Sequence, residues 1–390
     1  MKRIWLYLLL AGLVAACGEN PQPETEPDSE TEKPGLYVGG DISVLQSYED
    51  KGVAYYDDKG TIIADVLKYM KSDAVGWNAQ RVRLFVNPAR KDPDGNTDAQ
   101  VCQDLDYVVR LCKRIKAAGF ALLLDFHYSD TWADPSNQWI PKEWASLNDS
   151  QLETKVYEYT KACLQRLVKE GATPDFIQTG NEISYGMLWS VSVLRNDKTN
   201  RCFSDSPDAN WYRFIRLLQQ AAKACREVCP KAKIVIHTER SGDPSALKDI
   251  YSRLVSVDYD IIGLSYYPFW HNSLQVLSQS LSTLKTAFPS KKVQIVETAY
   301  YYQWQPEIIP YDFSSKWPIS PAGQAAFAKD LIAELKKHDN VNALYWWFPE
   351  ENGNGPDNSV LTGWVNRGLW DDTSHKALPG LYVLKEFLAR

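Results

Sequence analysis

Two glutamates have the residue type and the local setting for acid–base chemistry on a sugar bond. Glu182 follows the short apolar segment 176–179, and Glu297 ends the apolar segment 293–297. Hydrolysis of a glycosidic bond needs one carboxylic acid that protonates the leaving oxygen. It also needs a carboxylate that attacks the anomeric carbon or activates water. The two residues are therefore candidates, provided that the fold brings the ends of their segments together.

Eight short apolar segments are predicted to be strands that position these glutamates. They are rich in Val, Ile, Leu and aromatic residues, which is typical of strands buried on both faces. Their ranges are 36–40, 81–86, 120–126, 175–179, 233–238, 261–266, 293–297 and 342–348.

Eight segments with apolar residues every three to four positions alternate with the strands and are predicted to be helices. Asp98, Asn148 and Ser320 provide N-caps for three of them. This alternation predicts one (β/α)8 TIM barrel over residues 35–390. A doubly wound open sheet is the alternative, but no Gly-x-Gly-x-x-Gly follows any strand. The helix ranges are 61–72, 98–118, 150–169, 210–228, 244–254, 273–287, 321–337 and 379–389.

Polar side chains gather where the predicted strands end, which is where a barrel of this kind builds its site. Packing alone gives no reason for polar residues at one end of otherwise apolar strands. Besides the two glutamates, they are Asp41, Asp125, His127, Asn181, His237, Glu239, Ser265 and Tyr266, while the strand 81–86 carries Arg81 and Arg83 along its length.

Several of these segments resemble glycoside hydrolase family 53, the endo-β-1,4-galactanases of the retaining (β/α)8 glycosidases. The most specific is Asp-Phe-His-Tyr-Ser-Asp-Thr-Trp-Ala-Asp-Pro at 125–135, and the similarity covers nearly all of 35–390. The resemblance implies an arabinogalactan endo-β-1,4-galactanase that cleaves galactan and arabinogalactan side chains of pectin. Further matching segments are 39–43, 81–88, 179–183 and 262–268.

The resemblance implies that Glu182 is the general acid/base and Glu297 the nucleophile. Glu182 must be protonated when substrate binds, so apolar neighbours or the charge of Glu297 should raise its pKa. Glu297 must be ionised in order to attack. We expect only one of Arg81 and Arg83 to face the site, and from the family position we favour Arg81 as the partner of Glu297.

The resemblance also implies a set of substrate-binding residues. Tyr266 would hydrogen-bond the nucleophile, and Asn181 would bind the sugar 2-hydroxyl. Trp346 would form the stacking floor, with Trp347 packed outward. Asp134 would line a neighbouring subsite or, equally, anchor its loop. The other residues expected to bind the substrate or shape its site are Asp41, Asp125, His127 and Trp132.

Composition limits the partners and the rival functions. The chain has 43 basic and 49 acidic residues and no long basic tract, which argues against nucleic acid. Its 14 Trp and 22 Tyr residues suit sugar rings. We expect a monomer that acts on a polysaccharide. One rival is a related barrel acting on xylan, mannan or cellulose. Another is a non-catalytic glycan-binding lipoprotein, which predicts loss of one of the two glutamates.

The N-terminus predicts export and attachment to a membrane. Lys2 and Arg3 precede an apolar run, 4–16, that is too short to span a bilayer. The run ends at Cys17 in a sequence that resembles a lipoprotein box. We therefore expect a signal peptide at 1–16 and a lipid on Cys17. Residues 17–34 are predicted to be a flexible acidic tether. This predicts an exported bacterial lipoprotein at the outer membrane or cell surface; a plain cleavable signal is the alternative.

The remaining six cysteines suit either disulfides or buried free thiols, and the sequence does not choose. The sequence contains no Cys-x-x-Cys motif and no paired His spacing that would predict a zinc site. We expect that the protein requires no cofactor. The loop 349–363 has oxygen ligands of the kind that structural calcium uses, but no clear calcium motif. We expect a solvated polar loop there. Among the residues of this loop are Glu350, Glu351, Asp357 and Asn358.

Overall fold

The computed structural model describes residues 35–88, 95, 98–189, 199–305, 309–353 and 366–389. The predicted signal peptide, Cys17 and the tether lie outside these ranges. From Leu36 onward the chain is a single unit. Within the described ranges, no helix has the length and apolar character needed to cross a bilayer.

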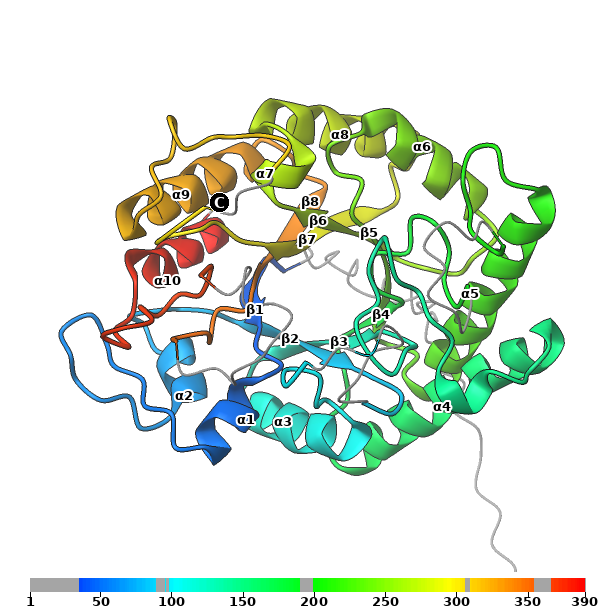
Figure 1. Ribbon diagram of the computed structural model, residues 1–390, viewed down its shortest axis with the longest axis horizontal. Coiled ribbons are helices and arrows are strands. Elements are labelled where there is room, and N and C mark those ends of the chain that lie inside the picture. The colour runs from blue at the N-terminus through cyan, green and yellow to red at the C-terminus, as the bar shows by residue number, and fades with distance from the viewer. Residues whose placement is uncertain are drawn as a thin grey trace, which may run out of the picture. The chain divides into compact units, whose positions relative to one another are not determined.

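Eight parallel strands close into a barrel in the order in which they occur in the chain (Figure 1). The first strand pairs with both the second and the eighth, which closes the ring. This confirms the predicted (β/α)8 architecture. The strands are β1 (Tyr37–Asp41), β2 (Ala79–Leu84), β3 (Ala121–Phe126), β4 (Phe176–Thr179), β5 (Lys233–Thr238), β6 (Ile261–Tyr266), β7 (Lys292–Thr298) and β8 (Val341–Trp347).

The helices form an outer ring around this barrel (Figure 1). Each predicted helix has a counterpart, whereas the short helices α1 and α7 were not predicted. The helices are α1 (Leu45–Asp50), α2 (Val66–Lys71), α3 (Leu105–Ala117), α4 (Asp149–Lys169), α5 (Asp208–Val228), α6 (Pro244–Arg253), α7 (Pro268–His271), α8 (Leu274–Ala287), α9 (Pro321–Leu335) and α10 (Pro379–Val383), with 3-10 turns η1 (Lys142–Trp144) and η2 (Leu384–Leu388).

Helix starts follow local capping chemistry at two of the three predicted places. Asn148 caps α4 in a reciprocal box with Gln151, and the Ser320 hydroxyl accepts from the backbone of α9. The cap predicted at Asp98 is wrong, because α3 starts later, after Asp104. Oδ2 of Asp98 instead accepts a 2.6 Å hydrogen bond from the Trp132 indole.

An apolar layer fills the barrel interior towards the N-terminal ends of the strands. Each strand from β2 to β8 contributes to it, while the larger apolar cluster joins the strands to the helices. The layer leaves only the C-terminal ends of the strands open for polar groups. Its residues are Ala79, Leu123, Phe176, Val235, Ile261, Val296, Ala343 and Tyr345.

A β-bulge on β7 decides where Glu297 points. Leu264 pairs with Ile295 but Ser265 pairs with Glu297, so Val296 is an extra residue on β7. In a regular strand, neighbouring side chains face opposite sides, so a Val296 side chain in the barrel interior would place the Glu297 side chain towards the helices. Because of the extra residue, Val296 joins the interior layer and Glu297 still faces the site.

All six described cysteines are free thiols, so the alternative of free thiols holds for this part of the chain. Five of them are buried, in the apolar surroundings that suit this side chain. They are Cys102, Cys112, Cys163, Cys202, Cys225 and Cys229.

Candidate active site

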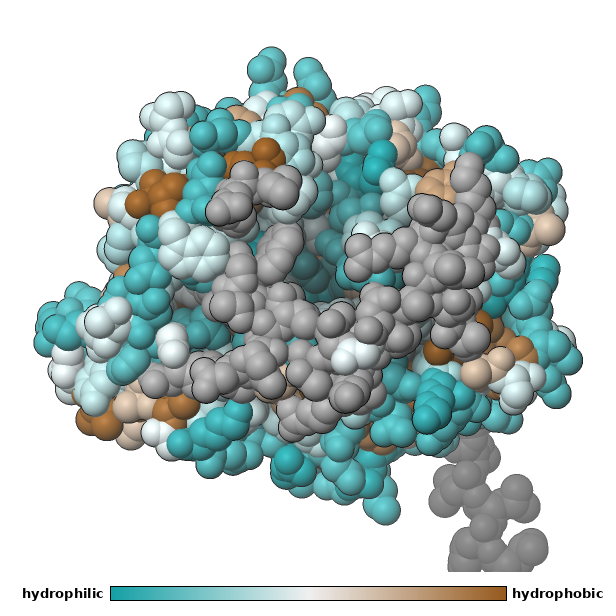
Figure 2. Space-filling model, viewed as in Figure 1, coloured by the Kyte–Doolittle hydropathy of each residue, from teal (hydrophilic) through white to brown (hydrophobic). Residues whose placement is uncertain are grey.

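A cleft of about 1010 Å³ opens at the C-terminal ends of the strands. Figure 2 shows a hollow near the middle of this face, with hydrophilic residues at its floor. Seven predicted site residues line the cleft, whereas Asp41, Asp125, Tyr266 and Trp346 do not. The seven are Arg81, His127, Trp132, Asp134, Asn181, Glu182 and Glu297.

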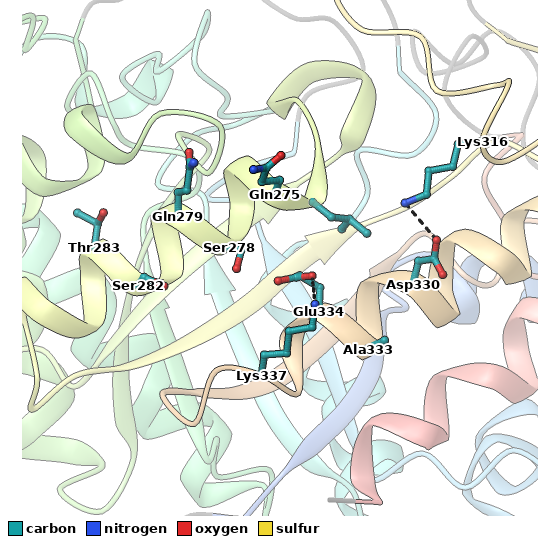
Figure 3. A pocket seen from close by; sticks show the side chains of 11 residues that line it. Gln275, Ser278, Gln279, Ser282, Thr283, Lys316, Asp330, Ala333, Glu334 and Lys337 are labelled. Carbon is teal, nitrogen blue, oxygen red and sulfur yellow. Dashed lines mark hydrogen bonds and ion pairs between the residues drawn. The ribbon is translucent and has the colours of Figure 1, made fainter.

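A second cavity, of about 830 Å³, lies between α8 and α9 and differs from the cleft in its chemistry (Figure 3). Its charged side chains pair with one another, Lys316 with Asp330 and Lys337 with Glu334. No aromatic ring is among its described lining residues. Its described residues therefore offer no aromatic stacking surface, and each of its two carboxylates is paired with a lysine.

Glu297 is held at both of its carboxylate oxygens. Nη2 of Arg81 lies 2.9 Å from Oε1, and the Tyr267 hydroxyl donates to Oε2 over 2.9 Å. Burial raises the pKa of Glu297, while the Arg81 guanidinium and the Tyr267 hydroxyl act in the opposite direction. The two contacts orient the carboxylate and favour its ionised form, while burial and the charges of Asp41 and Asp125 leave its pKa above the ordinary value.

The residue predicted to hydrogen-bond the nucleophile was wrong by one position. The Tyr266 hydroxyl donates to the backbone oxygen of Asn272 over 2.9 Å, and its ring stacks on Phe327 of α9. Tyr267 contacts Glu297 instead. Side chains alternate along a strand, so Tyr267 faces the same way as Ser265, whose hydroxyl reaches Glu182.

The two tryptophans at the end of β8 point in the reverse of their predicted directions. Trp346 is 0% exposed, and its indole donates to the backbone oxygen of Arg367 over 2.8 Å. Trp347 lines the cleft and packs on Trp132, with ring centroids 6.4 Å apart. Tyr345 faces the barrel interior, so alternation carries Trp347 inward and Trp346 towards the helices.

Both arginines of β2 face the site, which corrects the expectation that only one would. Residues 81 and 83 are two apart and therefore share a face of the strand. Arg81 contacts Glu297 and the side-chain oxygen of Asn181, the latter over 2.8 Å. The Arg83 guanidinium lies 4.6 Å from the centre of the Trp132 ring.

Asp41 and Asp125 lie beneath the cleft and do not line it; they shape the site through Arg81, which is the other role expected of them. Both are fully buried, and both pair with Arg81, at 2.6 and 2.8 Å. A buried guanidinium needs such partners because isolated charges are costly away from water. Burial opposes the ionisation of Asp125, but Arg81 and His127 hold its pKa below the usual range.

His127 and Asp134 shape the cleft wall on the loop after β3. Nε2 of His127 lies 3.1 Å from Oδ2 of Asp125, and its Nδ1 accepts from the backbone of Ala133. Asp134 accepts from the backbone N–H groups of Ser136 and Asn137, at 2.6 and 2.8 Å. Asp134 therefore anchors its own loop while it lines the cleft.

Glu182 has a different environment from Glu297. It lies in the left-handed backbone region, with φ at 50°, which is uncommon for this residue type. Its Oε1 accepts a 2.6 Å hydrogen bond from the Ser265 hydroxyl. Burial, followed by the charges of Glu297 and Glu239, raises the pKa of Glu182 well above its ordinary value. The surroundings therefore favour a proton on Glu182, whereas Glu297 has a cation beside it.

Sequence reasoning gave no role to several residues that the structure places at the site. Tyr267 and Trp347 were recoverable by counting alternate positions from a neighbour whose direction is known. His237, Glu239 and Ser265 were recognised only as polar strand ends. Glu239 lines the cleft beside Glu182, and burial raises its pKa to about 7.

The described residues contain no group of three or more side chains suited to hold a metal ion. The prediction of a solvated loop is wrong for Glu350 and Glu351, which are both buried. Oε1 of Glu350 accepts from the backbone of Val44 over 2.9 Å, and Glu351 accepts from the Tyr48 hydroxyl. Asp357 and Asn358 lie outside the described residues.

Known proteins resemble this chain over most of its length. The model of glycosyl hydrolase family 53 matches residues 37–384. An endo-beta-1,4-galactanase of Bacillus subtilis is 30% identical over 85% of this chain and 73% of its own length. An arabinogalactan endo-beta-1,4-galactanase of Thermothelomyces thermophilus is 34% identical over 80% of this chain and 89% of its own length. A solved GH53 catalytic domain of Ignisphaera aggregans is 31% identical, with a TM-score of 0.77, covering 94% of this chain and 98% of that chain. The chain therefore belongs to glycosyl hydrolase family 53.

Proposed function

We propose that the protein is a retaining arabinogalactan endo-β-1,4-galactanase that acts as a monomer on the galactan side chains of pectin. The observation that carries the proposal is the pair of carboxyls in one cleft, with a cation beside Glu297 and a neutral hydroxyl beside Glu182. Galactanase relatives over most of the chain support galactan over xylan, mannan or cellulose.

In the first step a carboxylate oxygen of Glu297 attacks the anomeric carbon. The bond from that carbon to the bridging oxygen breaks, and Glu182 gives its proton to this oxygen as the leaving sugar departs. In the second step Glu182, now ionised, takes a proton from water, and the water oxygen attacks the same carbon. Glu297 is released as a carboxylate and the sugar leaves with its configuration retained.

The neighbours of the pair support these roles. Arg81 and Tyr267 hold both oxygens of the nucleophile, which fixes its direction and favours its charged form against the effect of burial. Asn181 lies on the cleft wall next to Glu182 and is our candidate for the sugar 2-hydroxyl. Trp347 offers the aromatic floor that we first assigned to Trp346.

A product time course tests the proposed substrate and the endo mode. The purified full-length chain would be incubated with linear β-1,4-galactan and, in parallel, with xylan, mannan and cellulose. We expect a rapid fall in galactan size with release of galacto-oligosaccharides. Activity on another glycan alone would reject the galactanase assignment, and silence on all four would favour the glycan-binding rival.

Substitution of the nucleophile tests the mechanism. Glu297→Gln should abolish turnover while the fold and galactan binding stay close to wild type, because the amide cannot attack. Glu227→Gln, at a half-exposed ion pair on α5, is the matched control and should retain activity. A crystal structure should place the two carboxyls ~5–5.5 Å apart, and a separation near ~8 Å would indicate inversion instead.

Attachment to a membrane is a separate part of the proposal, supported by the sequence around Cys17. A lipid on this cysteine would hold the barrel at the outer membrane or cell surface. Cell fractionation of the wild type and of Cys17→Ser tests it. The wild type should sediment with membranes and the variant should not; equal distribution of the two would reject the anchor.

A further inference from the structure

Ser265 and His237 lie behind Glu182 and join it to the barrel interior through hydrogen bonds. Oγ of Ser265, on β6, donates to Oε1 of Glu182 over 2.6 Å and lies 2.9 Å from Nε2 of His237 on β5. Both side chains are fully buried, and neither is among the described residues that line the cleft. They are therefore placed to act on Glu182 rather than on a substrate.

The contacts of His237 determine where its ring carries the proton. The backbone N–H of Glu182 lies 3.3 Å from Nδ1, and the side-chain nitrogen of Gln178 lies 3.1 Å from it. A backbone N–H can only donate, so Nδ1 accepts and the neutral ring is protonated on Nε2. Oδ1 of Asn181 also lies 3.0 Å from Nδ1, but its two lone pairs have other donors, Arg81 at 2.8 Å and Gln178 at 3.2 Å.

The ring is also neutral. Burial, with the charge of Arg81 as the next cause, lowers the pKa of His237 well below its ordinary value. Nε2–H of His237 then donates to Oγ of Ser265, which leaves the hydroxyl proton of Ser265 free to point at Glu182. The two hydrogen bonds therefore run in one direction, from His237 to Ser265 and from Ser265 to the acceptor Glu182.

We propose that Ser265, oriented by His237, is a positioning residue that keeps Oε1 of Glu182 as an acceptor and so places the catalytic proton on Oε2. No described residue has a hydrogen bond to Oε2, and Glu182 is partly exposed on the cleft wall. The proton then stands on the oxygen that is free to meet the leaving group. The inference rests on the proposed acid role of Glu182 and adds the residues that direct its proton.

The direction of the donor chain makes the proposal testable through pH. A hydroxyl that donates to Glu182 favours its ionised form, so removal of Ser265 should raise the pKa of Glu182. If Glu182 donated to Ser265 instead, removal would lower that pKa. The other groups that face Glu182 remain in place in such a variant; they are Glu297 from β7, Glu239 after β5 and Asp134 from the loop after β3.

The experiment compares the full-length wild type with Ser265→Ala. The control variant is Ser280→Ala, which also removes a buried serine hydroxyl, but one that donates to the backbone oxygen of Ser241. kcat/KM would be measured against pH on a β-1,4-galacto-oligosaccharide and on 2,4-dinitrophenyl β-1,4-galactobioside. In Ser265→Ala, the alkaline limb of the profile on the oligosaccharide should move to higher pH. At neutral pH, kcat/KM on that substrate should fall about tenfold or more, because the acid is misplaced.

The dinitrophenyl substrate separates proton placement from general damage to the site. Its leaving group departs without protonation, so kcat/KM of Ser265→Ala on it should stay within about twofold of wild type. Ser265→Thr keeps a hydroxyl and should keep the limb near its wild-type position. Should the alanine variant not fold, Ser265→Cys, with a weaker donor, should give a smaller upward shift.

Two outcomes would overturn the inference. One is an alkaline limb that stays in place or moves to lower pH in Ser265→Ala. The other is an equal loss on both substrates, which indicates a structural role only. A wild type that is silent on galactan would instead defeat the proposed function, so the two failures are distinguishable.

Discussion

The Tyr267 hydroxyl donates a 2.9 Å hydrogen bond to Oε2 of Glu297, while the adjacent Tyr266 points the opposite way and bonds to the backbone of Asn272. Tyr266 can therefore serve as the control residue for substitutions of Tyr267. A hydrogen bond to a charged group contributes roughly 1.5–3 kcal/mol, so Tyr267→Phe should lower kcat/KM on galactan about 10- to 100-fold.

Tyr266→Phe loses only a neutral hydrogen bond to the backbone. It should lose about 1 kcal/mol of stability in urea denaturation and keep near wild-type activity. Comparable activity losses in both variants would show that the tyrosine at 267 has no special relation to the nucleophile.

Substitutions of the two tryptophans of β8 should have different effects, one on substrate binding and the other on the stability of the fold. Trp347→Ala removes an aromatic ring from the cleft, so KM for galactan should rise with little change in the unfolding midpoint. Trp346→Ala leaves a cavity between the barrel and α9 and should cost about 3–5 kcal/mol of unfolding free energy. Michaelis curves and urea titrations of both variants measure this difference, and the reverse pattern would restore the first assignment.

Glu350 should make the fold less stable at alkaline pH. Burial raises its pKa from the ordinary 4.5 to about 8, so the folded state binds more protons than the unfolded state between these values. Stability from this residue is then fully present below the unfolded pKa and is lost as pH rises through the folded one.

Glu350→Gln removes this titration and keeps an acceptor for the backbone N–H of Val44. Between pH 5 and pH 9 the urea midpoint of the wild type should therefore fall further than that of the variant. Parallel curves for the two proteins would show that Glu350 does not titrate in this range.

The thermal stability of the described part of the chain should not depend on disulfide bonds. Its six cysteines are free, and burial raises the pKa of Cys163 to about 12 and that of Cys229 to about 11. The melting temperature should be the same with and without dithiothreitol. Mass spectrometry after thiol alkylation should find few modified sites in the native protein and six in the urea-unfolded 35–390 region. A drop in melting temperature on reduction would contradict this.

The architecture was predictable because the spacing of apolar residues within each segment differs between strands and helices. The strands β5 and β6 have the predicted bounds, and Asn148 and Ser320 mark helix starts through local hydrogen bonds. Asp98 failed as a cap because its carboxylate has a distant partner, the Trp132 indole, that no local pattern reveals.

Site residues were predictable by type but not always by direction. Resemblance placed both glutamates at the correct strand ends, yet it chose the wrong member of two adjacent pairs, 266/267 and 346/347. The direction of a side chain depends on which alternate positions of its strand face the barrel interior, and this is set by the pairing of the strand with its neighbours. On β7 the bulge at Val296 changes this alternation, and the change is visible only in the pairing registers with β6 and β8, not in the sequence of β7 itself.

The closure of the barrel between β1 and β8 also has a consequence for how the protein is made. Glu182 and Glu297 are both synthesised before β8, but until then β1 and β7 are open edges and Trp347 is missing from the cleft. Pairing of the first strand with the last spans nearly the whole chain, and such contacts form late. The nascent protein should therefore remain inert towards polysaccharide until its last strand is in place, and activity should then appear in a single step.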